Sequence, residues 1–251
     1  MRNLQRISAT EAEQQLRKVR LRQVASTAQR PLSHLLSDLA DKLQGERLEG
    51  PRRRHAHWEM YLRGKWPARR TTVAPSPSPL LPIEVSIWLR RNSGWLVIFE
   101  ASHALADATA HLVCAGLLGD PSSVSGMLLH LHHWAAIDDW LKRSSSEGGM
   151  LLGGRFYKAQ PADTSVEWIA FRQAPGSGET LIRECFETAE GIGELLIQTP
   201  YVKAIESSIT CRIGRTGNIR IYGTEVSDSV VEALLLELET VWENVPTEFD
   251  T

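Results

Sequence analysis

The sequence IEVSIWLRRNSGWLVIFE, residues 83–100, decides the fold of this chain. Two strand-like runs, 83–91 and 95–100, are rich in β-branched, apolar and aromatic residues and flank the turn-forming triplet NSG. A short polar turn with a glycine between two such runs is typical of a β-hairpin. Alanine and leucine dominate the next stretch, 101–118, and favour a helix. The region therefore predicts an antiparallel hairpin followed by a helix.

A similar order of elements is expected 123 residues later, where Gly94 corresponds to Gly217 and Ile98 to Ile221. There a hairpin and a helix together span 207–244, so this unit and 83–118 are candidates for an internal repeat. Two ordinary hairpin–helix units would give the same pattern. Either way, we expect an α+β fold in which an antiparallel sheet of β-hairpins carries packed helices.

Charge is distributed very unevenly along the chain. Residues 1–75 contain 16 Lys and Arg against 7 Asp and Glu, a net charge of +9. The whole chain has 28 and 30, which leaves 12 and 23, a net charge of −11, for 76–251. A basic segment of this kind docks on an acidic surface, which can be nucleic acid, lipid, another protein or the chain's own acidic body.

Three regions are expected along the chain. A basic arm over 1–66 is predicted to be helical, because Ser8 and Glu11 form a capping box before a helix and Pro31 begins a second one with a leucine stripe. Prolines then mark a stiff linker over 67–82. An α+β body follows over 83–251.

The arm supplies the candidate binding residues. Cations interleaved with aromatic side chains can contact phosphates and stack on bases, or dock on an acidic protein surface, and the sequence leaves both alternatives open. The candidates are Arg17, Lys18, Arg20, Arg22, Arg52, Arg53, Arg54, Trp58, Tyr61, Arg63, Lys65, Trp66, Arg69 and Arg70.

His103, Asp107 and His111 recur at i, i+4 and i+8 of the expected helix over 101–118, with Cys114 on the same face within about 80°. A His–Asp pair at this spacing can orient an imidazole or hold a metal. His103 and His111 would lie about 12 Å apart along the helix axis and cannot share one ion. We interpret them as a polar, partly exposed helix face with mutual i, i+4 hydrogen bonds, predict no metal site, and keep a metal-dependent hydrolase as a minor alternative.

Three further histidines, His130, His132 and His133, belong to an expected helix over 125–143. Regular helical geometry spreads them around the axis, so no three ligands are expected to converge on one point. We interpret this segment as a core or interface helix with partnered histidines.

The remaining motifs exclude several classes of protein. The three cysteines are odd in number, far apart and without a CxxC pair, which predicts a reducing, cytoplasmic location and no structural zinc site. No secretory h-region and no 18-residue apolar run is present. GxSxG, Walker A, GxGxxG and HExxH motifs are absent, so we expect no cofactor and no catalytic nucleophile.

Some stretches resemble a known family. The opening LQRISATEAEQQLRKV is similar to the R-x-S-x-x-E-A start of the cytosolic-ring (FliM-like) protein of type III secretion systems. Residues 88–118 resemble that family's hairpin and helix, and IDDWL at 137–141 continues the likeness. The family's C-terminal β-rich assembly module is not visible here. The resemblance implies a non-enzymatic scaffold at the cytoplasmic face of a membrane machine.

These observations favour a non-catalytic assembly or adaptor subunit that binds protein partners in a larger complex. The main alternative is a nucleic-acid-binding or RNA-processing subunit that binds RNA or DNA through the basic arm. The two differ in what the arm binds.

Overall fold

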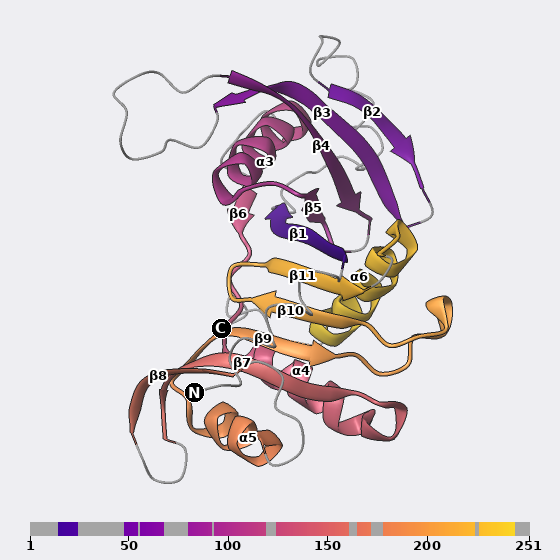
Figure 1. Ribbon diagram of the computed structural model, residues 1–251. Helices are drawn as coiled ribbons and strands as arrows, with labels where there is room; N and C mark the ends of the chain where they lie inside the picture. Colours follow the sequence, from indigo (N-terminus) through magenta and orange to yellow (C-terminus); the bar gives the residue numbers. More distant parts are fainter. Residues whose placement is uncertain are drawn as a thin grey trace. The chain divides into compact units, whose positions relative to one another are not determined.

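The computed structural model describes residues 15–24, 48–54, 56–67, 80–91, 93–118, 124–160, 165–171, 178–223 and 226–243. These residues form a mixed α/β structure with antiparallel strand pairing and four α-helices (Figure 1). The chain divides into two compact units, one made of 19–127 and the other of 1–18 and 128–251. The predicted combination of antiparallel hairpins and helices is thus confirmed for the described part of the chain.

The unit formed by 19–127 is a curved sheet with one described helix. The strand order is β2-β3-β4-β5-β1, and β6 pairs with β1. The elements are β1 (Gln15–Val24), β2 (Leu48–Arg53), β3 (His57–Pro67), β4 (Leu80–Arg90), β5 (Trp95–Phe99), α3 (His103–Leu118) and β6 (Val124–Gly126).

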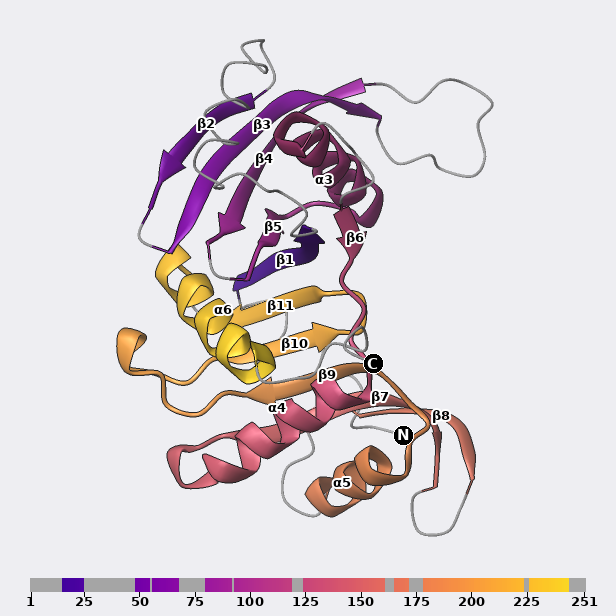
Figure 2. The same ribbon diagram turned by 180° about the vertical axis from the view of Figure 1, so that it is seen from behind.

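One face of this sheet forms an apolar core with α3. The register sets Met60 on β3 opposite Ile87 on β4, and Ile87 opposite Ile98 on β5, so alternate residues of three strands share this face. Ala106 and Ala110 of α3 are fully buried in the same cluster. Both ribbon views show α3 lying along β3 and β4 (Figures 1 and 2). Small side chains on the helix allow this close approach.

The opposite face of the same sheet is also buried, and it is more polar. Trp88 on β4 lies opposite Glu59 on β3 and opposite Val97 on β5. All three are buried, and His57 and Arg90 on this face are buried as well. A sheet with both faces covered explains why the strands lack the apolar–polar alternation of a half-exposed sheet.

The second unit contains a sheet in the order β11-β10-β9-β7-β8. Cys211, Ile213, Leu195 and Ile197 share one face, because their register pairs Cys211 with Ile197 and Ile213 with Leu195. Figure 2 shows α4 and α6 in front of these strands. The elements are α4 (Leu131–Arg143), η2 (Ser145–Glu147), β7 (Met150–Ala159), β8 (Val166–Phe171), α5 (Gly178–Thr188), β9 (Gly191–Gln198), η4 (Lys203–Ile205), β10 (Thr210–Gly214), β11 (Asn218–Gly223) and α6 (Asp228–Glu243).

The prediction of a helical N-terminal arm is wrong where the structure describes it. Residues 15–24 form strand β1, which pairs with β5 from Val19 to Gln23. Val19 and Leu21 alternate with arginines at period two, the spacing of a strand. Residues 48–53 and 57–67 are strands as well. The second expected helix, 31–43, lies outside the described residues.

The expected domain boundary at 67–82 is not where the units divide. Strands β3 and β4 pair along their full length, from His57 opposite Arg90 to Pro67 opposite Leu80. The segment between them therefore connects two neighbouring strands of one sheet. Proline density suggested a linker between domains, but it fits a connection between strands equally well.

Both expected hairpin–helix units are present, although their strand registers differ. Gly94 and Gly217 close the two turns, each with a φ of +68°. Glycine adopts this left-handed conformation without the clash that a Cβ would cause. Trp88 lies opposite Val97, whereas Cys211 lies opposite Ile221, one residue beyond the position that a spacing of 123 predicts. The internal repeat stays a prediction.

Candidate functional site

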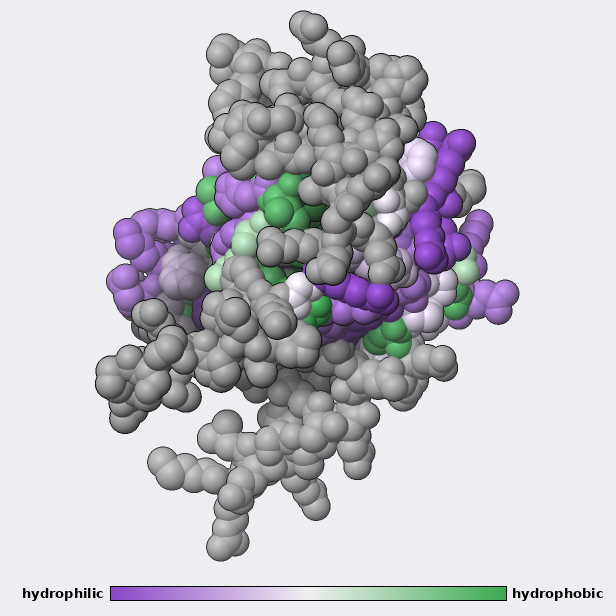
Figure 3. Space-filling model, turned by 90° about the horizontal axis from the view of Figure 1, so that it is seen from above, coloured by the Kyte–Doolittle hydropathy of each residue, from purple (hydrophilic) through white to green (hydrophobic). Residues whose placement is uncertain are grey.

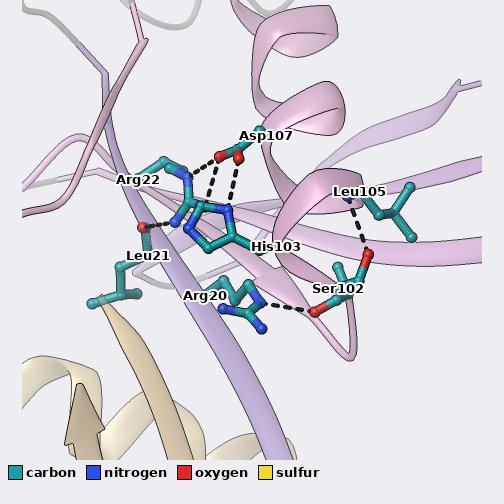
Figure 4. A network of polar contacts seen from close by, with 8 residues as sticks. Arg20, Leu21, Arg22, Ser102, His103, Leu105 and Asp107 are labelled. Carbon is teal, nitrogen blue, oxygen red and sulfur yellow. Dashed lines mark hydrogen bonds and ion pairs between the residues drawn. The ribbon is translucent and has the colours of Figure 1, made fainter. Parts of the chain in front are cut away.

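Arg22 on β1 is the most deeply buried of those basic candidate residues whose side chains the structure describes. Its side chain is 2% exposed. Its Nε and Nη2 donate hydrogen bonds to Oδ1 of Asp107 on α3 at 2.9 and 2.7 Å, and Nη1 donates to the carbonyl oxygen of Leu21 at 2.7 Å (Figure 4). Nε of Arg20 donates to the carbonyl oxygen of Ala101 at 2.9 Å. Both arginines therefore connect the strand to α3 and the segment before it.

Asp107 joins Arg22 to His103 (Figure 4). Its Oδ2 lies 2.7 Å from Nδ1 of His103, one helical turn earlier. Burial by itself would raise the pKa of Asp107, but the hydrogen bonds and positive charges of Arg22 and His103 outweigh it, and the pKa lies below its usual value. The carboxylate therefore stays ionised at neutral pH.

The predicted hydrogen bond between His103 and Asp107 at i, i+4 is confirmed, and it belongs to a clamp between strand and helix. His111 lies exposed further along α3, whereas Cys114 is fully buried and does not share that face. No group of three His, Cys, Asp or Glu side chains within the described ranges is arranged to hold a metal ion. The geometry suits a structural ion pair between a strand cation and a helix anion.

Arg17 anchors the start of α6 in the unit that contains 128–251. It forms an ion pair with Asp228 at 2.5 Å and donates from Nη1 to the carbonyl oxygen of Val226 at 3.3 Å. Asp228 occupies the first turn of the helix, where a carboxylate is favoured by the helix dipole. Lys18 is exposed. Arg17 thus has a structural role too.

The arginines around β2 and β3 that the structure describes are exposed, and two of them also form ion pairs. Arg52 and Arg53 are exposed at the end of β2, and Arg63 on β3 forms an exposed ion pair with Glu84 at 2.8 Å. Figure 3, drawn from above, shows hydrophilic and hydrophobic side chains interspersed among the coloured residues. Lys65 and Trp66 belong to β3, but their side chains lie outside the description, as do Arg69 and Arg70 entirely.

The two aromatic candidates with described side chains pack within their unit. Trp58 is half-buried and packs against the apolar core between the sheet and α3. Tyr61 lies half-buried on the other face and donates from its hydroxyl to Oε1 of Glu59 at 2.6 Å. Nε and Nη2 of Arg54 each lie 2.9 Å from Oε2 of the same carboxylate. Neither ring is laid out as an open stacking platform for bases.

Glu59 is a buried carboxylate that sequence reasoning missed. Burial would raise its pKa, but hydrogen bonds from Tyr61 and Arg54, together with the charges of Arg54 and His57, outweigh burial and lower the pKa. His57 stacks on Trp88 with ring centroids 4.1 Å apart. The alternation of His57, Glu59 and Tyr61 along one strand was the available signal, and the helical interpretation of this arm obscured it.

We expect the stabilising contribution of Glu59 to depend on pH. Its pKa is lower in the folded state, so the contribution is fully present above the unfolded-state value of about 4.3 and disappears as pH falls through the folded-state value. Glu59→Gln should cost about 2 kcal/mol at pH 7, because hydrogen bonds to a buried charge are lost, and progressively less in acid. Urea unfolding of both proteins from pH 7 to pH 3 measures the difference.

Glu84→Gln, which removes an exposed carboxylate from the neighbouring strand, controls for the loss of one charge. A cost for Glu59→Gln that stayed constant down to pH 3 would contradict the assignment.

The three histidines near α4 lie closer together than predicted. The helix begins at Leu131, and His130 is the extended residue before it, so regular helical spacing does not apply to all three. Ring centroids of His130, His132 and His133 are 4.2 to 6.0 Å apart. Nδ1 of His133 accepts the backbone N–H of His130 at 3.2 Å. The imidazole of His133 therefore helps to cap the N-terminus of α4.

The unit that contains 128–251 has a groove of about 400 Å³ on its surface. It lies among α4, the segment after it, the loop 200–204 and α6, and sequence reasoning did not indicate it because its residues come from three separate segments. We call it the 140/201/236 groove after its three large side chains. Its lining residues are Trp140, Ser144, Glu147, Pro200, Tyr201, Val202, Lys203, Ala204, Ala233, Leu236 and Glu237.

No protein-family model matches this sequence, and no curated protein matches it either. The likeness to the FliM-like family therefore rests on the residues quoted above. Among the described helices, none combines the length and apolar character needed to cross a bilayer.

All three cysteines are buried, and this predicts slow thiol chemistry in the folded state. Burial raises the pKa of Cys211 to about 12, so its reactive thiolate is scarce at pH 8. We expect Ellman's reagent to modify Cys211 only after the protein is unfolded in urea, where Cys114 and Cys185 also become accessible. Rapid release of thionitrobenzoate from three thiols of the native protein would contradict this expectation.

Proposed function

We propose that this chain is a non-catalytic assembly or adaptor subunit of a larger cytoplasmic complex. The supporting observation is the location of the large apolar side chains that are exposed to solvent. Within the described ranges, all of them lie in the unit that contains 128–251. A unit that exposes several large apolar side chains is a candidate for contact with other proteins. They are Leu128, Leu131, Met150, Tyr157, Trp168, Tyr201 and Leu236.

The finer form of the proposal is a ring subunit at the cytoplasmic face of a secretion machine. Its support is the resemblance of the opening segment, of 88–118 and of 137–141 to the FliM-like family. The ion pairs that Arg17, Arg22, Arg54 and Arg63 form within the chain are compatible with a scaffold, because such pairs stabilise the fold and leave binding to other surfaces.

Native complexes test this function directly. We expect the chain, purified under gentle conditions, to elute in a stable complex whose mass by light scattering exceeds the 28.0 kDa of one chain. Trp168→Ser should weaken that complex, because Trp168 is 62% exposed and its loss disturbs little of the fold. A strictly monomeric chain without a stable partner at micromolar concentration would refute the proposal.

The alternative function, nucleic-acid binding, is supported by Arg52 and Arg53, two consecutive exposed residues at the end of β2. Arg54 is a poor test residue because it holds Glu59. The double variant Arg52→Ala/Arg53→Ala should lower affinity for single-stranded RNA and reduce the slope of log affinity against log salt by about 1.4 if both contact phosphates. Fluorescence anisotropy measures both quantities. No binding at 50 mM salt would exclude this function.

A further inference from the structure

The 140/201/236 groove combines aromatic walls with two carboxylates. Trp140 projects from α4, Tyr201 from the loop after β9, and Leu236 from α6. Tyr201 and Leu236 are each about half exposed. The acidic residues are Glu147 in η2 and Glu237 on α6. The groove therefore offers apolar contact and negative charge in the same place.

The carboxylates of the groove lack a compensating ion pair among the described residues. Glu237 is half-buried, and both its burial and the nearby negative charge of Glu147 raise its pKa. Lys203 also lines the groove, but no ion pair within the described ranges joins it to either carboxylate. One lysine against two glutamates leaves the lining with a net negative charge, and a bound cation would relieve the repulsion between Glu147 and Glu237.

Hydrogen bonds of the backbone and of Thr199 hold the loop that forms one wall of the groove. The N–H of Tyr201 donates to the carbonyl oxygen of Glu147 at 3.0 Å, and the N–H of Val202 donates to that of Ser207 at 2.9 Å. The buried Thr199 accepts the N–H of Ile209 through Oγ1 at 2.8 Å. A groove held in place before binding loses little conformational entropy when a ligand enters.

We propose that the 140/201/236 groove receives a single arginine side chain, flanked by apolar residues, from a protein partner. The guanidinium would lie between Glu147 and Glu237 and beside the rings of Trp140 and Tyr201, which favour a cation by charge and by cation–π attraction. Its aliphatic stem and apolar neighbours would cover Leu236. A phosphate-bearing ligand is disfavoured by the same carboxylates.

This inference rests on the proposed assembly function and names the chemistry of the partner at one site. Arginine is enriched at the centres of protein interfaces because its planar fork pairs with carboxylates and stacks on aromatic rings. A lysine would satisfy the charge but would stack less well on Trp140. We therefore expect arginine to bind more tightly than lysine at this site.

Matched peptides test the inference. The probe is a capped fluorescent peptide with one arginine between two leucines, compared with the same peptide carrying citrulline, which keeps the shape of arginine but has no charge. We expect the arginine peptide to bind the full chain about tenfold more tightly than the citrulline peptide, as the loss of a charge-assisted contact predicts. Fluorescence anisotropy gives both dissociation constants.

Two variants on one helix locate the site. Glu237→Gln should lower affinity for the arginine peptide about tenfold and remove the preference over citrulline. Glu243→Gln makes the same chemical change at an exposed position of α6 outside the groove and should leave affinity unchanged. Because Glu237 has no ion-pair partner within the described part, its replacement should not unfold the protein.

Three results would overturn the inference: equal affinity for the arginine and citrulline peptides, unchanged binding by Glu237→Gln, or binding of free arginine as tight as that of the peptide. The last would indicate a small-molecule site. A protein that forms its native complex but shows one of these results would refute the groove's role alone. A monomer without partners would refute the assembly function itself.

Discussion

Asp107→Ala is expected to lower the free energy of unfolding by about 2–3 kcal/mol. The substitution leaves the guanidinium of Arg22, which is only 2% exposed, without its carboxylate partner. An uncompensated buried charge is among the costliest single defects in a protein, at about 3–5 kcal/mol. We place the effect below that range because Asp107 itself is 40% exposed, so solvent can partly replace it.

A double-mutant cycle measured by urea unfolding separates the pair from its surroundings. Arg22→Met removes the charge and keeps most of the apolar stem, so Arg22→Met/Asp107→Ala should be more stable than Asp107→Ala alone. Asp139→Ala, on the exposed side of α4, is the control and should change stability by less than about 0.5 kcal/mol. If Asp107→Ala behaved like Asp139→Ala, the ion pair would not be important for the fold.

The Arg22–Asp107–His103 network shows how far the sequence could predict this part of the molecule. His103 and Asp107 are four residues apart on one helix, so their hydrogen bond follows from helical geometry alone. Arg22 is 85 residues away from Asp107 in the chain. Nothing in local spacing connects them, because the pairing of β1 with β5 is what brings Arg22 to α3.

The arm shows why the local signal was misread. A capping box and a later proline favoured a helix at the start of the chain, while Val19 and Leu21 also fitted a strand. Residues 15–24 form a strand because they pair with β5, and such tertiary pairing commonly overrides local helix propensity. Arginines that appeared to face solvent on a helix instead alternate across a strand, and Arg20 and Arg22 turn toward α3.

Helix α5 is a second segment whose periodicity is ambiguous in the sequence. Ile182 and Cys185 are buried three residues apart, on one side of the helix. In an eleven-residue segment both periods fit about equally well, and packing against β7 selects the helix. The 140/201/236 groove lay beyond sequence reasoning for a related reason, since its lining comes from separate segments that only the fold unites.

Trp88→Ala is expected to have the largest effect of any single substitution proposed, about 4 kcal/mol of destabilisation. Trp88 is 1% exposed on the polar face of its sheet. Its ring stacks on His57 at 4.1 Å and meets the edge of Phe99 at 4.6 Å. The substitution removes a large buried ring and leaves a cavity between two other rings. Such substitutions usually lower the free energy of unfolding by about 3–5 kcal/mol.

Two further tryptophan substitutions test whether the cost comes from the buried position of Trp88 or from the loss of any indole ring. Trp168→Ala removes the same group from a site that is 62% exposed and should cost less than about 1 kcal/mol. Trp88→Phe should cost clearly less than Trp88→Ala, because phenylalanine keeps most of the stacking and removes a buried indole N–H for which the described residues offer no acceptor. Urea unfolding followed by circular dichroism measures all three. Equal costs for Trp88→Ala and Trp168→Ala would show that the rings of His57, Trp88 and Phe99 do not form a packed core on this face.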